Sequence, residues 1–271
     1  MLNHYQIFKS SNFQINRMKQ IPNIFTLLNL IFGCLAIVVT IQNGIIITYD
    51  TDGSQLIAIP EKIWMASMFI GIAAIVDFLD GFVARLFKAS SEMGKQLDSL
   101  ADVVSFGVAP SMIIYQFLRM SIASEEDGLN VSVIWLVPAF IIAAAGAWRL
   151  ARFNIDNSQS YGFKGVPIPA VGIVVASLPL IYWYNHSELV VDILLNKWFL
   201  YGLIILLSGL MISTLPLMAL KFKDFTIKNN LPKIILLAIA IVAAFIFHWL
   251  AVPIVFIVYI ILSLLFKQPS S

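Results

Sequence analysis

The chain has 271 residues, of which 60% are hydrophobic and 12% are charged. Together with a mean hydropathy of +0.90, this composition excludes an ordinary soluble protein and predicts an all-α, polytopic membrane helix bundle. The net charge of +2 at pH 7 gives no sign of a nucleic-acid partner, and we expect none. A single cysteine, Cys34, excludes an intrachain disulfide.

The first 20 residues carry three basic side chains, Lys9, Arg17 and Lys19, among apolar ones. A cleavable signal peptide would place its charges before an uninterrupted apolar core and a small-residue cleavage site, and that order is absent. We therefore expect residues 1–20 to be a cytoplasmic segment that lies amphipathically on the membrane surface.

Apolar runs predict about eight membrane spans, six in a core domain over residues 21–220 and two in a C-terminal helical hairpin and tail over residues 221–271. The last apolar run, Ile234–Phe266, is too long for one span, and His248 and Pro253 divide it into two short ones. The six core spans are predicted at Ile21–Gln42, Ile63–Phe87, Met93–Leu118, Val131–Arg152, Pro167–Tyr184 and Trp198–Leu220.

The basic residues predict the orientation of these spans. If the N-terminus is inside, 14 of the 17 Lys and Arg residues fall on inner segments. By the positive-inside rule, both termini are then cytoplasmic. We expect a multi-pass protein of the cell (inner) membrane.

Four aspartates stand near the adjoining ends of the second and third spans: Asp77, Asp80, Asp98 and Asp102. The first two are three residues apart and the last two are four apart, so each pair shares one face of a helix. Carboxylates crowded in a low dielectric repel one another, and divalent cations relieve the repulsion. Oxygen ligands suit Mg²⁺ or Mn²⁺ better than zinc. The alternative is a pair of solvated acidic helix ends, but charge within a membrane segment is costly and by default functional.

The residues between the aspartates fit a phosphate site. Gly81 and Gly94 have no side chain, so backbone or ligand can approach closely. Arg85 can direct a guanidinium at a phosphate near the helix end. Ser91 and Lys95 add a hydroxyl and a charge near the turn.

Asn23, Thr26 and Asn29 recur at three-residue steps and make one polar stripe on the first apolar span. Two interpretations are open. The stripe could form hydrogen bonds between helices, or it could face a ligand cavity, which we favour.

The spacing from Asp77 to Asp102 resembles a known signature. Asp77, Asp80, Gly81, Ala84, Arg85, Gly94, Asp98 and Asp102 fill the pattern Asp-x2-Asp-Gly-x2-Ala-Arg-x8-Gly-x3-Asp-x3-Asp of the CDP-alcohol phosphotransferases. The resemblance implies an integral membrane enzyme, in this family often a homodimer, that displaces CMP from a CDP-linked lipid with an alcohol. It implies a pair of Mg²⁺ or Mn²⁺ ions on the four aspartates, with Asp102 also as the base. It further implies that Asn23, Thr26, Gly81, Arg85 and Ser91 contact the CDP-lipid.

Further motifs are similar to the phosphatidylserine synthase branch of this family, which joins CDP-diacylglycerol and L-serine. They are Ile21-Pro22-Asn23, Thr26-Leu27-Leu28-Asn29, Phe106-Gly107-Val108-Ala109-Pro110, Arg149-Leu150-Ala151-Arg152-Phe153-Asn154 and Gly165-Val166-Pro167-Ile168-Pro169. Pro110 also predicts a kink in the third span. Two alternatives stay open: another alcohol acceptor, such as glycerol 3-phosphate or inositol phosphate, and a membrane transporter that uses the carboxylates as a cation path.

Serine carries a carboxylate that some basic group must recognise. Arg149 and Arg152 lie three residues apart at the predicted cytoplasmic end of the fourth span, and Lys164 follows nearby. They are predicted to bind serine. The alternative is that they are ordinary positive-inside anchors.

Overall fold

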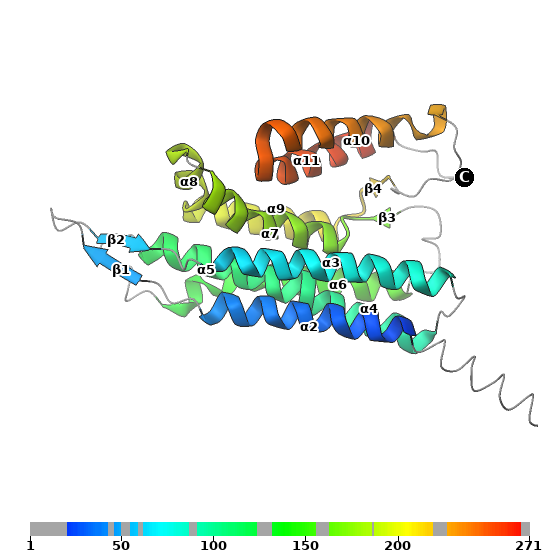
Figure 1. The fold of residues 1–271 in the computed structure, drawn as a ribbon, viewed down its shortest axis with the longest axis horizontal. Coiled ribbons are helices and arrows are strands. Elements are labelled where there is room, and N and C mark those ends of the chain that lie inside the picture. Colours follow the sequence, from blue (N-terminus) through cyan, green and yellow to red (C-terminus); the bar gives the residue numbers. More distant parts are fainter. Residues whose placement is uncertain are drawn as a thin grey trace, which may run out of the picture.

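The computed structural model describes residues 21–42, 46–49, 55–58, 62–86, 91–123, 132–155, 163–185, 187–218 and 227–266, and shows a bundle of long helices that run roughly side by side (Figure 1). The predicted surface segment over residues 1–20 lies outside the described part. The α-helices are α2 (Ile21–Gln42), α3 (Ile63–Leu86), α4 (Glu92–Asp102), α5 (Ala109–Ala123), α6 (Ile141–Ile155), α7 (Ile168–Tyr184), α8 (Glu188–Leu194), α9 (Lys197–Ile212), α10 (Ile227–Phe247) and α11 (Ala251–Leu265).

Helices α2 and α3 pack against each other along their length. Their connection, which the span assignment left without predicted structure, contains two antiparallel strands, β1 (Ile46–Tyr49) and β2 (Gln55–Ala58). In their register Ile46 pairs with Ala58 and Tyr49 pairs with Gln55.

The third predicted span is one helical run in which a π-helical segment, η1 (Val103–Val108), joins α4 to α5. At its end the Ala109 amide donates to the Val104 carbonyl, five residues back. The next residue is Pro110, which has no N–H to continue the ladder. The irregularity expected near Pro110 therefore takes the form of a π-helical segment just before it.

Two short 3₁₀ segments, η3 (Val133–Trp135) and η4 (Val137–Phe140), precede α6. After α6, the short strand β3 (Phe163–Lys164) pairs with β4 (Pro216–Leu217), which follows α9. Gly165 makes this junction possible, because its φ of 77° is one that only glycine adopts easily and a Cβ there would lie 2.5 Å from the Met211 carbonyl oxygen.

Helices α10 and α11 are joined by a 3₁₀ turn, η5 (His248–Leu250), and pack against each other as a C-terminal hairpin (Figure 1). His248 has a positive φ of 48° in this turn. Helix α11 also packs on α7 and β4, and the Tyr259 hydroxyl donates to the Met218 carbonyl at 3.0 Å. The C-terminal hairpin is thereby fixed to the rest of the bundle.

The predicted number of eight spans is not confirmed. Five described helical runs are long and apolar enough to cross a membrane, counting Asn230–Leu265 as one, and α8 with α9 would be a sixth although the two bend by 63°. Helix α7 is apolar but shorter. The predicted end of the sixth span at Leu220 is wrong, because α9 ends at Ile212 and the chain then turns toward Pro216, which disfavours a helix before it.

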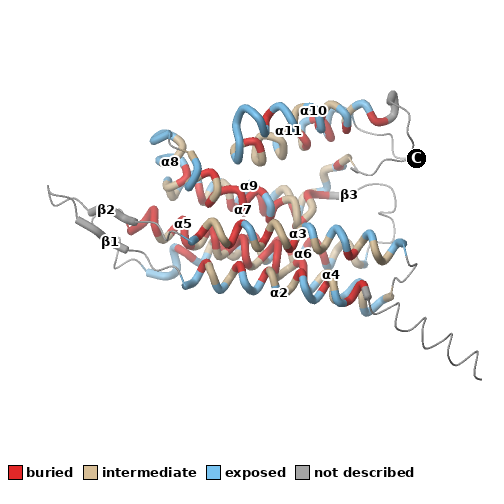
Figure 2. The backbone as a smooth tube through the Cα atoms, in the orientation of Figure 1, coloured by how far each residue is buried: buried red, intermediate tan, exposed pale blue. Residues whose placement is uncertain are grey.

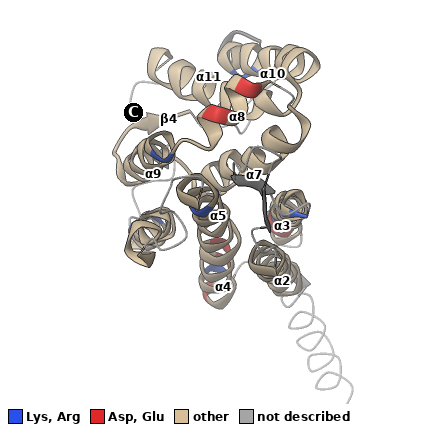
Figure 3. Cartoon of the chain, turned by 90° about the vertical axis from the view of Figure 1, so that its left-hand side faces the viewer, with Lys and Arg blue, Asp and Glu red and all other residues tan. Residues whose placement is uncertain are grey.

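Buried residues gather where α3, α5, α6 and α7 meet, whereas the outer faces of α2 and α10 are exposed (Figure 2). Exposed Ile and Leu side chains on those faces suit a lipid environment. Charged residues are sparse along the described helices, and the two acidic residues of α8 stand at the end opposite the signature aspartates (Figure 3). The fold is therefore a multi-pass membrane helix bundle with the signature aspartates near one end.

Candidate metal centre and active site

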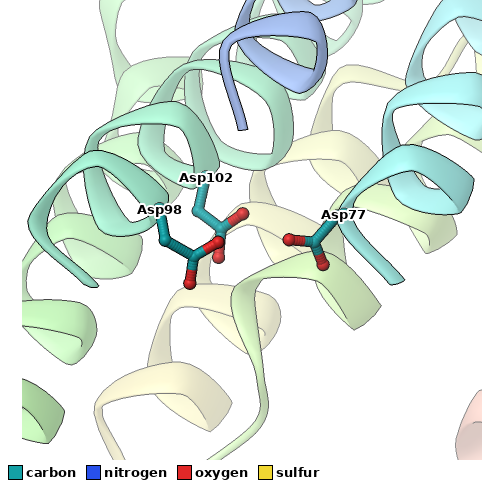
Figure 4. Close-up of side chains that lie close together, drawn as sticks. All are labelled: Asp77, Asp98 and Asp102. Carbon is teal, nitrogen blue, oxygen red and sulfur yellow. The ribbon is translucent and has the colours of Figure 1, made fainter. Parts of the chain in front are cut away.

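Three aspartates that are distant along the chain converge at one end of the bundle. Figure 4 shows the carboxylates of Asp98 and Asp102, one helical turn apart on α4, facing the carboxylate of Asp77 on α3. One oxygen from each lies within 4.8 Å of the others. Unit charges at about 4 Å repel by ~4 kcal/mol at an effective dielectric of 20, so this arrangement calls for a counter-charge.

Asp80 stands beside this trio rather than within it. It is one turn beyond Asp77 on α3, is 7% exposed, and its charge interacts with Asp77 and Asp98. Thr26 of α2 donates its hydroxyl proton to Asp80 Oδ2. The other oxygen, Oδ1, is buried and has no hydrogen-bond partner among the described residues.

The four carboxylates fit a divalent metal centre. All the donors are hard oxygens, which suit Mg²⁺ or Mn²⁺. The unpartnered Oδ1 of Asp80 also supports a bound cation, because burying an oxygen without a donor costs free energy unless a cation or water binds it. Two helices thus supply a ligand set that no single segment of the chain could supply.

The polar stripe of α2 turns toward these aspartates. Asn23, Thr26 and Asn29 are all buried. Thr26 bonds Asp80, and the Asn29 side-chain amide donates to Asp102 Oδ1 at 3.5 Å. Thr26 and Asn29 thus make hydrogen bonds between helices, as the first interpretation expects, and their partners are carboxylates of the site. That the stripe faces a ligand cavity stays a prediction.

Ser105 supports this arrangement, and the sequence interpretation did not single it out. Its hydroxyl donates to the Asn29 backbone carbonyl at 2.9 Å, which ties η1 to α2 next to Asp102. Ser105 is three residues after Asp102, so it shares a helical face with it. This three-residue spacing from Asp102 was the sequence signal that could have identified Ser105.

The glycines and the serine of the signature have distinct surroundings. A Cβ on Gly94 would lie 3.1 Å from both Asn23 Oδ1 and Ser91 Oγ, so this glycine lets α4 approach α2 closely. Ser91 is the N-cap of α4, and its hydroxyl accepts from the Gly94 amide at 3.0 Å. Among the described residues, a Cβ on Gly81 would meet only the Arg85 guanidinium, at 3.7 Å, so these residues leave the space beside Gly81 open.

The two arginines of α6 differ in their surroundings. Arg149 is 6% exposed, interacts electrostatically with Asp102, and places its guanidinium 5.7 Å from the centre of the Phe153 ring. Its Nε has no hydrogen-bond partner among the described residues. Arg152 donates two hydrogen bonds of 2.9 Å, to the carbonyls of Ile212 and Ser213 at the end of α9.

Hydrogen bonds also fix the end of α6 against α4. The Asn154 amide donates to Ser99 Oγ at 2.8 Å, and the Lys95 ammonium donates to the Asn154 carbonyl at 3.4 Å. Lys95, which was predicted to carry charge near the turn, thus contacts α6. The backbone of Lys164 lies in β3, and its side chain is outside the described part.

A sequence model of the family described as CDP-alcohol phosphatidyltransferase matches residues 19–215 of this chain. This range contains every residue of the site described above.

Curated relatives are similar over much of the chain. A CDP-diacylglycerol–serine O-phosphatidyltransferase of Helicobacter pylori is 33% identical over 238 residues, which cover 86% of this chain and 84% of the relative. The enzyme of that name from Bacillus subtilis is 37% identical over 122 residues, 45% of this chain and 64% of the relative. An archaetidylserine synthase of Methanothermobacter thermautotrophicus is 34% identical over 135 residues, 49% of this chain and 54% of the relative.

Proposed function

The chain belongs to the CDP-alcohol phosphatidyltransferase family, and from that premise we propose that it transfers the phosphatidyl group of CDP-diacylglycerol to L-serine, giving phosphatidylserine and CMP. The observation that carries this proposal is the convergence of Asp77, Asp98 and Asp102, with Asp80 beside them. A transporter would string its charged groups along a path through the membrane. Here three of the four aspartates face one another between α3 and α4 (Figure 4).

The four aspartates would hold one or two divalent cations, Mg²⁺ or Mn²⁺. Bound there, the cations would neutralise the diphosphate and polarise the phosphorus for in-line attack. Neighbouring side chains would hold these aspartates in position. Thr26 fixes one oxygen of Asp80 from α2, and Asn29 directs its amide at Asp102, so the ligand set is arranged before substrate binds.

In the reaction the serine hydroxyl oxygen forms a bond to the lipid-side phosphorus, and the bond from that phosphorus to the CMP oxygen breaks. The serine proton passes to a carboxylate oxygen of Asp102, and CMP leaves with the electron pair. Because a carboxylate under a metal's influence is a weak base, proton transfer accompanies attack. No covalent intermediate on the enzyme is needed, since serine is the nucleophile.

Arg149 is our candidate for recognition of the serine carboxylate. It is buried beside Asp102, and its Nε lacks a hydrogen-bond partner among the described residues, so it can donate to a bound anion. Arg152 has the role of capping α9, because its guanidinium is bonded to the last carbonyls of that helix. Of the two arginines proposed for the serine site, we therefore favour Arg149 for the carboxylate.

We assign the CDP-lipid to the other side of the aspartates. Gly81 leaves open space there, and the exposed Arg85 one turn on can reach a phosphate. Asn23 of α2 and the hydroxyl of Ser91, the N-cap of α4, both lie close to Gly94 at the start of α4. The 14 basic residues of the inner segments orient this end of the bundle to the cytoplasm, where serine enters and CMP leaves.

CMP release by the purified protein tests the proposal. CDP-diacylglycerol is supplied with Mg²⁺ or Mn²⁺ and with serine, glycerol 3-phosphate or inositol phosphate in turn, and the lipid product is identified by mass. We expect phosphatidylserine with serine alone, no release after EDTA, and recovery when the cation is restored. Asp192→Asn on α8, an exposed aspartate outside the site, serves as the charge-matched control for Asp98→Asn.

The same assay separates the alternatives. If glycerol 3-phosphate or inositol phosphate gave the lipid product, the assigned acceptor would change but the phosphatidyl-transfer reaction would stand. Absence of CMP release with every acceptor, from protein that elutes as a folded species, would contradict the enzyme assignment and favour a transporter.

A further inference from the structure

A groove runs between α7 and the C-terminal hairpin, outside the metal centre. Its cavity of about 490 Å³ lies within the roughly 300–1,000 Å³ usual for small-molecule sites. Apart from His248, Trp249 and Tyr259, its lining is aliphatic or phenyl. The proposed chemistry uses none of these residues.

Small residues make the groove hollow. On α10, Leu236, Ala240 and Ala244 recur every four residues and form one wall, and His248 of η5 lines the groove beyond the end of the helix. Ala170 of α7 faces the same cavity. Larger side chains at these alanines would fill the space between the two helices.

One end of the groove approaches the Arg149 side of the candidate site. Pro167, the N-cap of α7, and Tyr259 of α11 both line it. Tyr259 interacts electrostatically with Arg149, which in turn interacts with Asp102. Ile168, next to Pro167, packs on Gly146, one turn before Arg149 on α6. A ligand with its head at the aspartates can therefore extend its tail along α7.

We propose that this groove holds one acyl chain of the diacylglycerol lipid during phosphatidyl transfer, a proposal that rests on the function given above. The reacting phosphate carries a glycerol with two chains, and both must pass from the metal centre into the membrane. The groove starts beside Arg149, follows α7 inward, and offers aliphatic walls from three helices. Its occupant is thus continuous with the substrate's head group, unlike a bulk lipid on the outer face of α10.

The test uses CDP-diacylglycerol with a photoreactive diazirine at the end of one acyl chain. The wild-type protein in mixed micelles is irradiated, and labelled peptides are mapped by mass spectrometry. We expect labels on groove residues of α7, α10 and α11 that disappear when unlabelled CDP-diacylglycerol is in excess. Labelling of the outer faces alone, or labelling that excess substrate does not remove, would overturn the proposal.

Groove-filling variants give a second readout. Ala244→Phe and Ala240→Phe should raise KM for CDP-diacylglycerol by about tenfold and leave KM for serine unchanged. The matched control is Ile241→Phe, because Ile241 is 51% exposed on the same helix and does not line the groove. Unchanged KM values in folded groove variants would overturn the proposal, as would a change of oligomeric state, which would make the groove a contact between two copies.

The two proposals fail separately. Groove labelling that excess substrate abolishes, found without CMP release, would contradict the serine reaction but support the lipid site. CMP release without such labelling would support the reaction but contradict the acyl-chain site.

Discussion

Thr26 of α2 donates a hydrogen bond to Asp80 Oδ2 of α3 and leaves the buried Oδ1 of the same carboxylate without a partner among the described residues. One oxygen is thus held by a neighbouring helix while the other is available to a ligand. Partners of this kind orient metal-binding groups and fix which oxygen faces the ion. The contact links the polar stripe of α2 to the metal centre.

We predict that Thr26→Val, which keeps the shape but removes the hydroxyl, raises the divalent-cation concentration needed for half-maximal activity by about 10- to 100-fold, as is typical when a partner of a metal ligand is lost. The measurement is a Mg²⁺ or Mn²⁺ titration of CMP release. Thr26→Ser keeps the hydroxyl and should restore the wild-type titration. Identical titrations for the valine variant and wild type would show that the hydrogen bond does not position Asp80.

Gly81→Ala should separate folding from substrate binding. The added methyl group meets only the Arg85 guanidinium, at 3.7 Å, which is an ordinary contact, and Ala is favoured over Gly in a helix by about 0.5–1 kcal/mol. We therefore expect an unchanged or higher Tm in detergent. KM for CDP-diacylglycerol should rise by about tenfold if the open space beside Gly81 receives the nucleotide end.

The control for that variant is Gly202→Ala on α9, where a Cβ would meet no atom of the described residues within 4 Å. It should leave both the Tm and the KM for CDP-diacylglycerol near wild type. If Gly81→Ala behaves the same way, the nucleotide binds elsewhere.

The two arginines of α6 should respond differently to substitution. Arg149→Lys keeps the charge but loses Nε and the planar fork, so KM for serine should rise by about tenfold or more with KM for CDP-diacylglycerol unchanged. Arg152→Ala removes two bonds to the end of α9 and should lower the Tm, with a loss of about 1 kcal/mol, while KM for serine stays the same. The reverse pattern would make Arg152 the carboxylate site.

Local spacing predicted which aspartates share a helix face. Asp77 and Asp80 lie one turn apart on α3, Asp98 and Asp102 lie one turn apart on α4, and Asp77 faces the second pair. Spacing could not separate Asp80 from the trio, because that depends on the bond from Thr26 across two helices. Nor could it tell Arg149 from Arg152, since their difference arises from the position of α9.

The fold was predictable where hydrophobicity decides it. The first two spans match α2 and α3 to within a residue at each end, because long apolar runs bounded by polar residues define them. The end of α9 at Ile212 was not found, because Leu215 to Leu220 is as apolar as the helix. Pro216, which disfavours a helix before it, was the available signal, and the pairing of β4 with β3 leads the chain away from the helix. The strands β1 and β2 were not predicted, because the segment between the first two spans has no alternating pattern long enough to indicate them.

The final prediction separates metal binding from proton transfer. Asp102 is assigned both roles, whereas Asp77 is assigned only the first. Asp102→Asn keeps the size and one oxygen but loses the charge and nearly all basicity, so at raised cation it should bind CDP-diacylglycerol and stay inactive. Loss of a general base typically lowers the rate by roughly 100- to 10,000-fold.

Asp77→Asn should recover part of its turnover at high cation, because its defect is in affinity for the ion. Both variants are titrated with Mg²⁺ or Mn²⁺ while lipid binding and CMP release are measured on the same samples. Asn29 keeps its amide next to position 102 in both, so the comparison isolates the charge of Asp102. Near-normal turnover of Asp102→Asn at high cation would make Asp102 a ligand only, and another group would have to accept the serine proton.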